Sequence, residues 1–246
     1  MEIENKVALV TGAGGTLGEA IVRRFVELGM KVAMIDIDGT RLLDLAEELG
    51  ENTHPIAIDL SNEEAIDFAC QEVRAKWGKV DILVNNAGIL TNNKAAETSS
   101  EEWRKVMAVN LDSAFLLSRE WLPSMKEQGW GRIINICSLA AKTGGLTAGT
   151  AYTTSKGGMT ALTFSLAREA AEFGVTVNGI APAYIKTKMV MEQLTEAQRE
   201  ALLDAIPVRR FCEAEEVAHV VEFLADPLSG FITGEVVDIN GGLHLD

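Results

Sequence analysis

A tyrosine and a lysine lie four positions apart, at Tyr152 and Lys156, and together they could move a proton. Residues four apart on a helix lie on one face, one turn apart, so a phenol and an ammonium group at this spacing can face a common site. The pair alone is weak evidence, because a solvated lysine often lies beside a half-buried tyrosine by chance. Its weight increases because Asn110 and Ser138 precede it, and Ser138 ends an apolar strand.

The expected chemistry of this pair is general acid and base catalysis. A phenol titrates near ~10, so it is a poor base at neutral pH. A cation at roughly 4 to 5 Å, in an effective dielectric of about 20, stabilises the phenolate by on the order of 3 to 4 kcal/mol. We therefore expect Lys156 to lower the pKa of Tyr152, and Tyr152 to exchange the proton.

A second group of residues indicates a dinucleotide site near the N-terminus. An apolar strand ends at Thr11, and a turn with Gly12, Gly14, Gly15 and Gly18 leads into a helix. Glycines let the backbone bend sharply and approach a pyrophosphate at the helix N-terminus, where amide groups and the helix dipole favour an anion. Such a turn also occurs where a helix and a strand merely pack closely, so further evidence is needed.

Asp36 supplies that evidence, because it ends the next apolar run, eighteen positions after Gly18. A carboxylate at this place accepts hydrogen bonds from a ribose 2′-hydroxyl and repels a 2′-phosphate. Ile37 follows it, and the glycine-rich turn contains no Arg or Lys that would neutralise a phosphate. We therefore expect NAD(H) as the cofactor, with NADP(H) less favoured.

Strand and helix patterns alternate along the whole chain, which is typical of a parallel sheet covered on both faces. The pattern predicts one doubly wound α/β domain of the Rossmann type over residues 1–246, with a seven-stranded parallel sheet and helices on both faces. Capping patterns place helix starts at Ser61, Ser99 and Thr195. The expected strands are Lys6 to Thr11, Lys31 to Asp36, His54 to Asp59, Val80 to Asn85, Arg132 to Cys137, Thr176 to Ile180 and Glu235 to Ile239.

Composition narrows the class of protein. The 246 residues are 47% hydrophobic, enough for a sizeable core, and their formal net charge of −14 argues against nucleic acid or an anionic membrane surface as a partner. The three cysteines are widely separated, and no metal-ligand spacing appears, so we expect reduced thiols in a cytoplasmic protein and no metal. The N-terminus does not have the pattern of a signal peptide, and no apolar run would span a bilayer.

Taken in order, these motifs make the chain resemble the short-chain dehydrogenase/reductases in their common one-domain form. Relatives with a similar pattern include the 3-oxoacyl-acyl-carrier-protein reductases and the polyol and sugar dehydrogenases. The resemblance covers almost the whole chain and rests on Thr11 to Gly18, Asp59-Leu60, Asn85-Asn86-Ala87-Gly88, the series Asn110, Ser138, Tyr152 and Lys156, and Pro182 to Thr187.

The resemblance implies roles for individual residues. In a catalytic tetrad of Asn110, Ser138, Tyr152 and Lys156, Lys156 also binds the nicotinamide ribose, Ser138 holds the reacting oxygen, and Asn110 positions a water in a proton relay. Lys156 and the positive nicotinamide of the oxidised complex would together bring the pKa of Tyr152 close to working pH. The implied cofactor contacts are Gly12, Gly14, Gly15, Thr16, Leu17, Gly18, Asp36, Ile37, Asp59, Leu60, Asn86, Ala87, Gly88, Tyr152, Lys156, Pro182, Ile185 and Thr187.

The chain departs from the family pattern at two positions. Thr16 stands where the family usually has glycine, and the resulting GxxGxxG spacing is more typical of longer, epimerase-like relatives. Ala183 stands where glycine usually follows the proline. The first departure puts the path of the loop in doubt, and the second adds a methyl group beside the nicotinamide pocket.

The substrate region is expected to lie between and after these motifs, at residues 139–151 and in a mobile lid at about 184–211. The lid should contain a helix from Glu196 to Ala205. Met189, Val190, Met191 and Leu194 would give it an adaptable apolar surface, although such residues more often serve plain packing. Lys142, Lys186 and Lys188 near the expected mouth raise a weak hypothesis of an anionic group on the substrate.

Two helices, at about 110–128 and 152–173, carry apolar residues on more than one face, which suggests a second burial surface. The family resemblance implies a homotetramer built on them and on the C-terminal strand. The alternative is a monomer.

The function that these observations favour is NAD(H)-dependent interconversion of a secondary alcohol and a ketone. The substrate is expected to be a small polar hydroxy compound, such as a polyol, a sugar acid or a 3-hydroxyacyl derivative. One alternative is a 3-oxoacyl-acyl-carrier-protein reductase, which typically uses NADPH, and another is an epimerase or dehydratase. From a different class comes a non-catalytic dinucleotide sensor, although sensors of this kind can lose the tyrosine and lysine present here.

Overall fold

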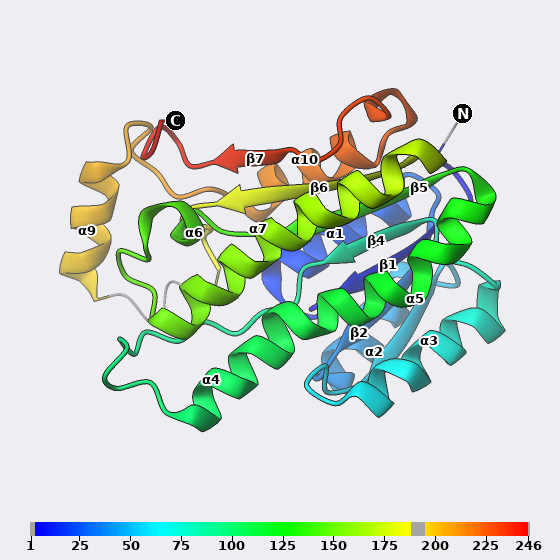
Figure 1. Ribbon diagram of the computed structural model, residues 1–246, viewed down its shortest axis with the longest axis horizontal. Helices are drawn as coiled ribbons and strands as arrows, with labels where there is room; N and C mark the ends of the chain where they lie inside the picture. The colour runs from blue at the N-terminus through cyan, green and yellow to red at the C-terminus, as the bar shows by residue number, and fades with distance from the viewer. Residues whose placement is uncertain (1–2, 188–194, 246) are drawn as a thin grey trace.

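The computed structural model describes residues 3–187 and 195–245 of the chain. In this part, seven strands form one sheet in the order β3-β2-β1-β4-β5-β6-β7, and all neighbouring strands are parallel (Figure 1). The strands are β1 Val7–Thr11, β2 Lys31–Asp36, β3 Thr53–Ala57, β4 Ile82–Asn85, β5 Gly131–Ile136, β6 Val175–Pro182 and β7 Val236–Ile239.

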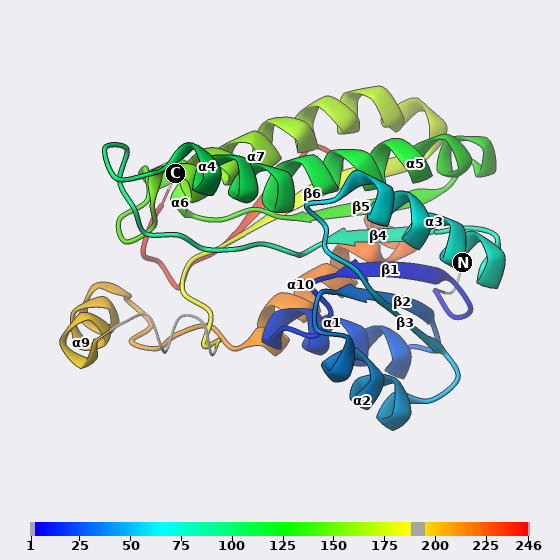
Figure 2. The same ribbon diagram turned by 90° about the horizontal axis from the view of Figure 1, so that it is seen from below.

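Helices cover both faces of the sheet, as the sequence predicts. Figure 2 shows α1, α2 and α10 on one side and α3, α4, α5 and α7 on the other. The helices are α1 Thr16–Glu27, α2 Gly39–Leu49, α3 Glu63–Trp77, α4 Ser100–Met107, η1 Ala108–Asp112, α5 Ser113–Gln128, α6 Ala140–Thr143, α7 Thr150–Ala170, η2 Ala171–Phe173, α9 Glu196–Ala205, α10 Ala214–Ala225 and η3 Pro227–Ser229.

The central strands are buried along their whole length, because a parallel sheet with helices on both faces leaves no side for water. All residues of β1, β4, β5 and β6 are buried. One apolar cluster lies between the sheet and α1 and α10, and it includes Phe25 and Val221. A second cluster lies between the sheet and α3, α5 and α7, and it includes Trp121.

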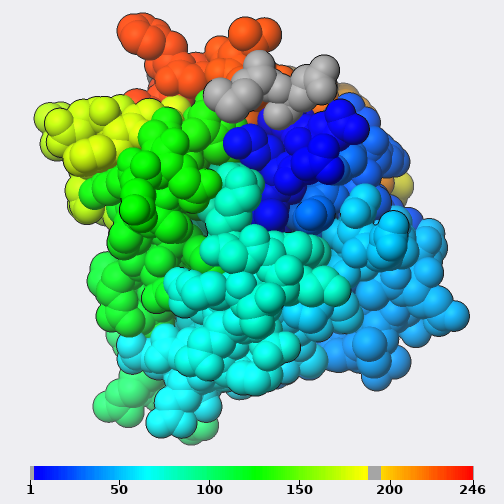
Figure 3. Space-filling view, turned by 90° about the vertical axis from the view of Figure 1, so that its right-hand side faces the viewer, coloured from blue at the N-terminus to red at the C-terminus, as the bar shows by residue number. Residues whose placement is uncertain are grey.

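The strand order places the site. From β1 the chain builds β2 and β3 on one side, then returns to lay β4 against the other side of β1, so the order reverses between β1 and β4. The carboxyl ends of the strands point toward α6, α9 and the C-terminus (Figure 1). Figure 3 looks onto another end of the molecule, where the blue, cyan and green segments pack against one another.

The predicted strands are confirmed to within one or two residues at each end, and the predicted helix over Glu196–Ala205 is also confirmed. Ser99 and Thr195 cap their helices as expected. The prediction for Ser61 is wrong, because Asn62 caps α3 while Ser61 donates from its hydroxyl to the Asp59 carboxylate at 2.8 Å. None of the described helices combines the length and apolar composition that a membrane crossing needs.

Candidate active site

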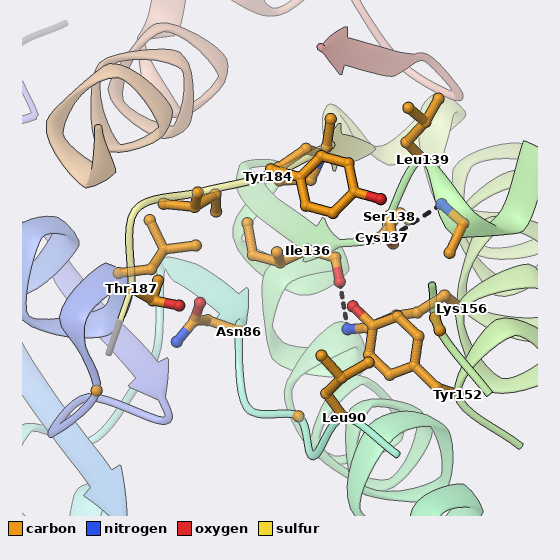
Figure 4. Close-up of a pocket in the computed structure, with 18 of the residues that line it drawn as sticks. Asn86, Leu90, Ile136, Cys137, Ser138, Leu139, Tyr152, Lys156, Tyr184 and Thr187 are labelled. Carbon is orange, nitrogen blue, oxygen red and sulfur yellow. Dashed lines mark hydrogen bonds between the residues drawn. The ribbon is translucent and has the colours of Figure 1, made fainter. Parts of the chain in front are cut away.

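A cavity of about 770 Å³ lies at the carboxyl ends of the central strands, beside the reversal of strand order. Ligands of open α/β sheets bind at this kind of place. Figure 4 shows side chains that reach this pocket from several elements. The predicted site residues that line the cavity are Gly12, Gly14, Gly15, Thr16, Leu17, Gly18, Asp36, Asn86, Ala87, Gly88, Ser138, Tyr152, Lys156, Pro182, Ile185 and Thr187.

The turn from β1 to α1 forms a cradle that only glycines can build. Gly12 has a φ of 65°, and a Cβ there would lie 2.9 Å from the Cα of Ala87. A Cβ on Gly18 would lie 2.7 Å from the carbonyl carbon of Gly12. The cap residue of α1, Gly15, has no side chain that could satisfy the first amide groups of the helix. A tight backbone turn at a helix N-terminus whose first amides have no side-chain cap fits the pyrophosphate of a dinucleotide.

Thr11 and Asn86 fasten the cradle to the loop after β4. The Thr11 hydroxyl accepts hydrogen bonds from the backbone N–H groups of Asn86 and Ala87, each at 3.0 Å. The Asn86 side chain donates to the Thr11 carbonyl oxygen at 2.8 Å and to that of Gly12 at 3.2 Å. These hydrogen bonds join the ends of β1 and β4, the two strands on either side of the reversal of strand order, so that they form one floor of the cavity.

Asp36 ends β2 beside the glycine turn. Its carboxylate accepts a hydrogen bond from the Gly14 N–H at 2.9 Å and another from the Asp38 N–H at 3.0 Å. Arg41, in the first turn of α2, lies close by, since a Cβ on Gly14 would be 3.3 Å from both the Arg41 Cγ and the Asp36 carboxylate. The turn itself contains no cation, but Arg41, which the sequence did not predict, lies beside it, and its guanidinium pairs with Glu19.

Tyr152 and Lys156 both lie on α7, one turn apart, and face the cavity (Figure 4). The Lys156 ammonium is buried and donates to the carbonyl oxygen of Ile136, at the end of β5, at 2.7 Å. It lies 5.9 Å from the centroid of the Tyr152 ring. The predicted helical spacing therefore brings the two groups to one wall of the cavity.

Burial dominates the electrostatics of this pair. It raises the pKa of the Tyr152 phenol, an effect that a hydrogen bond with Ser138 opposes and the neighbouring Cys137 reinforces. Burial also lowers the pKa of Lys156 to about 8. In the chain by itself, loss of solvent destabilises the phenolate and the ammonium alike. That Lys156 and a positive nicotinamide together bring the Tyr152 pKa close to working pH concerns the oxidised complex and stays a prediction.

Asn110 lies behind the cavity wall, in the π-helical turn η1 between α4 and α5. Its side-chain oxygen accepts from the Ile89 N–H at 2.8 Å, and its amide donates to the Ile89 carbonyl at 3.1 Å and to the Ser155 hydroxyl at 3.0 Å. A Cβ on Gly88 would lie 3.4 Å from the Lys156 ammonium and 3.5 Å from the Asn110 oxygen. Asn110 and Lys156 thus flank the same backbone segment.

Ser138 and Cys137 follow β5 and differ in surroundings. The Ser138 hydroxyl accepts from the Ala140 N–H at 3.1 Å. Cys137 is buried, and burial raises the pKa of its thiol. Cys137 is therefore a small buried residue that also borders the cavity, and its raised thiol pKa does not suit a nucleophile.

Three predicted cofactor residues do not line the cavity. Ile37 is exposed beyond Asp36, and Asp59 and Leu60 lie outside the cavity in the turn after β3. The Asp59 carboxylate instead accepts from the Ser61 N–H and hydroxyl, each at 2.8 Å. A short polar residue after a strand often stabilises its own turn in this way.

Other lining residues were missed, namely Leu90 and Asn92 after β4 and Leu243 after β7. Their only sequence signal is their position, since segments that follow the carboxyl ends of parallel strands meet at one edge of the sheet. By contrast, Leu146, Thr147, Ala148, Tyr184 and Gln198 fall within the expected substrate regions.

The hypothesis that lysines near the mouth bind an anionic group of the substrate receives no support from the described residues. Lys142 pairs with Asp238 at 2.6 Å, and Lys186 pairs with Glu213 at 3.2 Å. Lys188 lies outside the described residues. The expected apolar lid residues Met189, Val190, Met191 and Leu194 also lie outside them.

Comparison with known proteins gives a consistent result over the whole chain. Residues 6–198 match the family model described as short chain dehydrogenase. The chain is 40% identical over 246 residues to the 3-oxoacyl-acyl-carrier-protein reductase FabG of Vibrio cholerae, with 100% of both chains covered.

Two solved structures from Brucella melitensis are similar, each with a TM-score of 0.93. One is a short-chain dehydrogenase/reductase titled glucose/ribitol dehydrogenase, which is 32% identical, with 100% of this chain and 99% of that chain covered. The other is a 3-oxoacyl-acyl-carrier-protein reductase, 31% identical, with 100% and 93% covered.

Proposed function

The chain belongs to the short-chain dehydrogenase family of oxidoreductases, and from this premise we propose that it interconverts a small polar secondary alcohol and its ketone with NAD(H). The observation that carries the proposal is one cavity with two equipped ends. One end holds the glycine cradle with Asp36, and the other holds Tyr152, Ser138 and Lys156. Polyols, sugar acids and 3-hydroxyacyl compounds are the secondary alcohols that we propose as substrates.

The residues of the cradle would hold the cofactor. The turn from Gly12 to Gly18 and the first amides of α1 would bind the pyrophosphate, and Asp36 would accept from the adenosine ribose. Lys156, with Asn86, Pro182, Ile185 and Thr187, would face the nicotinamide half. A nicotinamide dinucleotide, when bound, supplies or accepts the hydride.

Tyr152 would exchange the proton with the reacting oxygen, which Ser138 would hold by a hydrogen bond. Because burial keeps the Tyr152 pKa above its ordinary value, the phenol is protonated at neutral pH and suits proton donation to a ketone. Asn110 would not contact the substrate itself; it would act through the Ile89 backbone, to which it is hydrogen-bonded, and through a water beside Lys156.

The preference for NAD(H) rests on the Asp36 carboxylate at the end of β2. It would lie where a 2′-phosphate has to be accommodated, and two backbone N–H groups hold it in place. Arg41 is the opposing consideration, because the stem of its side chain passes beside the turn, with its Cγ 3.3 Å from where a Cβ on Gly14 would lie. The ion pair with Glu19 already uses the charge of its guanidinium group.

Reduction of a 3-oxoacyl thioester is the second candidate function. It is favoured because two of the similar proteins, matched over 100% and 93% of their own length, are named as 3-oxoacyl-acyl-carrier-protein reductases. The resemblance implies NADPH for that reaction, which Asp36 disfavours. A higher kcat/KM with NADPH and a 3-oxoacyl thioester than with NADH and any small ketone would select it.

We further propose a cytoplasmic homotetramer with a substrate lid at 184–211, of which Gln198 reaches the cavity. Exposed rings lie on α5 (Phe115), on α7 (Phe164) and on the adjoining η2 (Phe173), and Phe231 is exposed in the segment that leads to the edge strand β7. Burial of these rings between copies would remove apolar surface from water. Sedimentation at several protein concentrations tests this, and a monomer throughout would contradict it.

The decisive assay follows the nicotinamide absorbance with NAD+ and NADP+ in parallel, across polyols, sugar acids and 3-hydroxyacyl thioesters. Tyr152→Phe serves as the blank. Turnover with NAD+ by the wild type only would support the proposal and identify the substrate class. Tight NADH binding with no turnover of any compound would favour the dinucleotide sensor.

A further inference from the structure

The side chain of Lys94 joins two segments on the substrate side of the cavity. Its ammonium group donates to the carbonyl oxygen of Gly145 at 3.0 Å and to that of Ala148 at 2.7 Å. These two carbonyls lie on either side of Leu146 and Thr147, both of which line the cavity. One cation thus holds both ends of a short piece of the pocket wall.

The backbone around Lys94 is itself fixed. Its carbonyl oxygen accepts from the N–H groups of Glu97 and Thr98 and from the Thr98 hydroxyl, at 2.9 to 3.0 Å. The ammonium group therefore projects from an anchored turn rather than from a free loop. A lysine on a free loop would lose more conformational entropy on making the same contacts.

The two segments also lie backbone against backbone. The Gly149 N–H donates to the Thr91 carbonyl at 2.7 Å, and the Thr150 N–H donates to the Asn93 carbonyl at 3.0 Å. A Cβ on Gly149 would lie 2.6 Å from the Asn93 carbonyl oxygen, so only glycine permits this approach. Because Gly149 is the N-cap of α7, the junction lies immediately before the helix that carries Tyr152.

The segment held by Lys94 presents a hydroxyl to the opposite wall. The Thr147 hydroxyl lies 3.2 Å from the Tyr184 hydroxyl, so the two side chains span the pocket. Figure 4 shows the Tyr184 ring reaching across from the end of β6, with its hydroxyl toward Ser138 and Leu139. The backbone of Tyr184 is fixed in turn, since its carbonyl accepts from the Cys212 N–H at 2.9 Å.

The Thr147 and Tyr184 hydroxyls can make further hydrogen bonds after they have bonded to each other. Together they carry two donors and four acceptor lone pairs, and their mutual contact uses one of each. One O–H donor and three lone pairs can therefore face a substrate. A hydroxyl group, which both donates and accepts, matches this pair better than a methyl group does.

We propose that Thr147 and Tyr184 recognise a hydroxyl group next to the reacting carbonyl of the substrate, and that Lys94 is the positioning residue that holds Thr147 in place. The inference rests on the proposed function and narrows its substrate class to hydroxyketones and the corresponding vicinal diols. Lys94 acts through the 145–148 segment and touches no reacting atom.

The test compares hydroxyacetone with 2-butanone, two ketones of similar shape that differ by a hydroxyl in place of a methyl group. Thr147→Val should lower kcat/KM for hydroxyacetone by roughly three- to tenfold, the range for one hydrogen bond, and leave 2-butanone unchanged. Tyr184→Phe should act alike, and the double variant should lose less than the product of the two.

Lys94→Met should raise KM for hydroxyacetone several-fold while kcat and the Kd for NADH stay near wild type. Lys94→Arg, which can still donate to two carbonyls, should restore most of the loss. Lys105→Met, at an exposed lysine on α4, is the matched control and should change nothing.

The outcomes separate this inference from the proposed function. A wild type that reduces no ketone would defeat the proposed function itself. A wild type that reduces ketones, but whose ratio of hydroxyacetone to 2-butanone is unaltered in Thr147→Val and Tyr184→Phe, would overturn the recognition of a hydroxyl. Equal loss in Lys94→Met and Lys94→Arg, with weaker NADH binding, would show a general structural role and overturn the positioning role.

Discussion

The two ends of the cavity differ in what forms their surface: mainly backbone at the cofactor end and mainly side chains at the substrate end. At the cofactor end, the backbone from Gly12 to Gly18 forms the surface, and Asp36 is the main polar side chain. At the substrate end, side chains such as Leu90, Thr147 and Tyr184 form it, from segments far apart in the chain. A backbone site tolerates few local changes, whereas a side-chain site can be altered residue by residue. The comparison predicts that substitutions at the two ends affect different kinetic constants.

Tyr152 lies between the ends, and its substitution should give the largest effect on turnover. Tyr152→Phe removes the proton donor and should lower kcat by about 10²- to 10⁴-fold, the usual contribution of general acid catalysis. The Kd for NADH, measured by fluorescence titration, should stay near wild type. If the variant retained activity, Tyr152 would have no part in the mechanism.

At the cofactor end, Gly18→Val should abolish tight NADH binding, because even a Cβ would collide with the Gly12 carbonyl. Overpacking of about 1 to 3 kcal/mol corresponds to a Kd raised by roughly five- to 150-fold. Gly157→Ala is the matched control, since no neighbouring atom lies within 4 Å of an added Cβ. The control should bind NADH normally and gain about 0.5 to 1 kcal/mol in stability from its helix propensity. Equal losses in both variants would contradict a specific cradle.

The pH dependence should differ between the two reaction directions. Because the Tyr152 pKa is raised, its protonated form persists through neutral pH, so ketone reduction should be nearly flat there. Alcohol oxidation needs the phenolate, and its kcat/KM should rise by up to about tenfold for each pH unit below that pKa. Initial rates in both directions over one buffer series measure this. A flat oxidation profile would mean that the bound cofactor lowers the Tyr152 pKa below the pH range measured.

Asp36→Asn should give the smallest effect and the clearest change in cofactor choice. The amide oxygen can still accept from the Gly14 N–H, so the turn should persist while the negative charge is lost. Loss of a charge-assisted hydrogen bond should weaken NAD(H) by about tenfold, and NADP(H) should gain because repulsion falls. Parallel kcat/KM values for the two cofactors test this. If the ratio of the kcat/KM values for the two cofactors did not change, Arg41 rather than Asp36 would be the residue to test for cofactor choice.

The difference between the ends also explains what could be predicted from the sequence. The fold followed from apolar strands alternating with helices, and the cradle from glycines between Thr11 and Gly18, because both signals are local. The spacing of Tyr152 and Lys156 fixed their common helix face for the same reason. Local patterns are legible because few conformations satisfy them.

The rest depends on contacts between distant residues. Lys94 lies about fifty positions from the carbonyls that it binds, and no spacing rule links them. The raised Tyr152 pKa was also out of reach, since desolvation depends on how completely the surrounding chain excludes water. Asp59 shows the converse case: its carboxylate serves the local turn in this structure, and the cofactor contact implied by the family resemblance stays a prediction.

The position of β1 in the sheet also affects how the chain folds during its synthesis on the ribosome. β1 lies between β2 and β4, and the buried bond from the Val7 N–H to the Asp81 carboxylate joins residues 74 positions apart. At roughly 5 to 20 residues per second, a nascent chain waits about 4 to 15 seconds between making the two halves of that pair. During that interval the inner edge of β1 has no strand beside it and can pair with another chain. The unpaired edge of β1 therefore exists before β4, and with it the site, has formed.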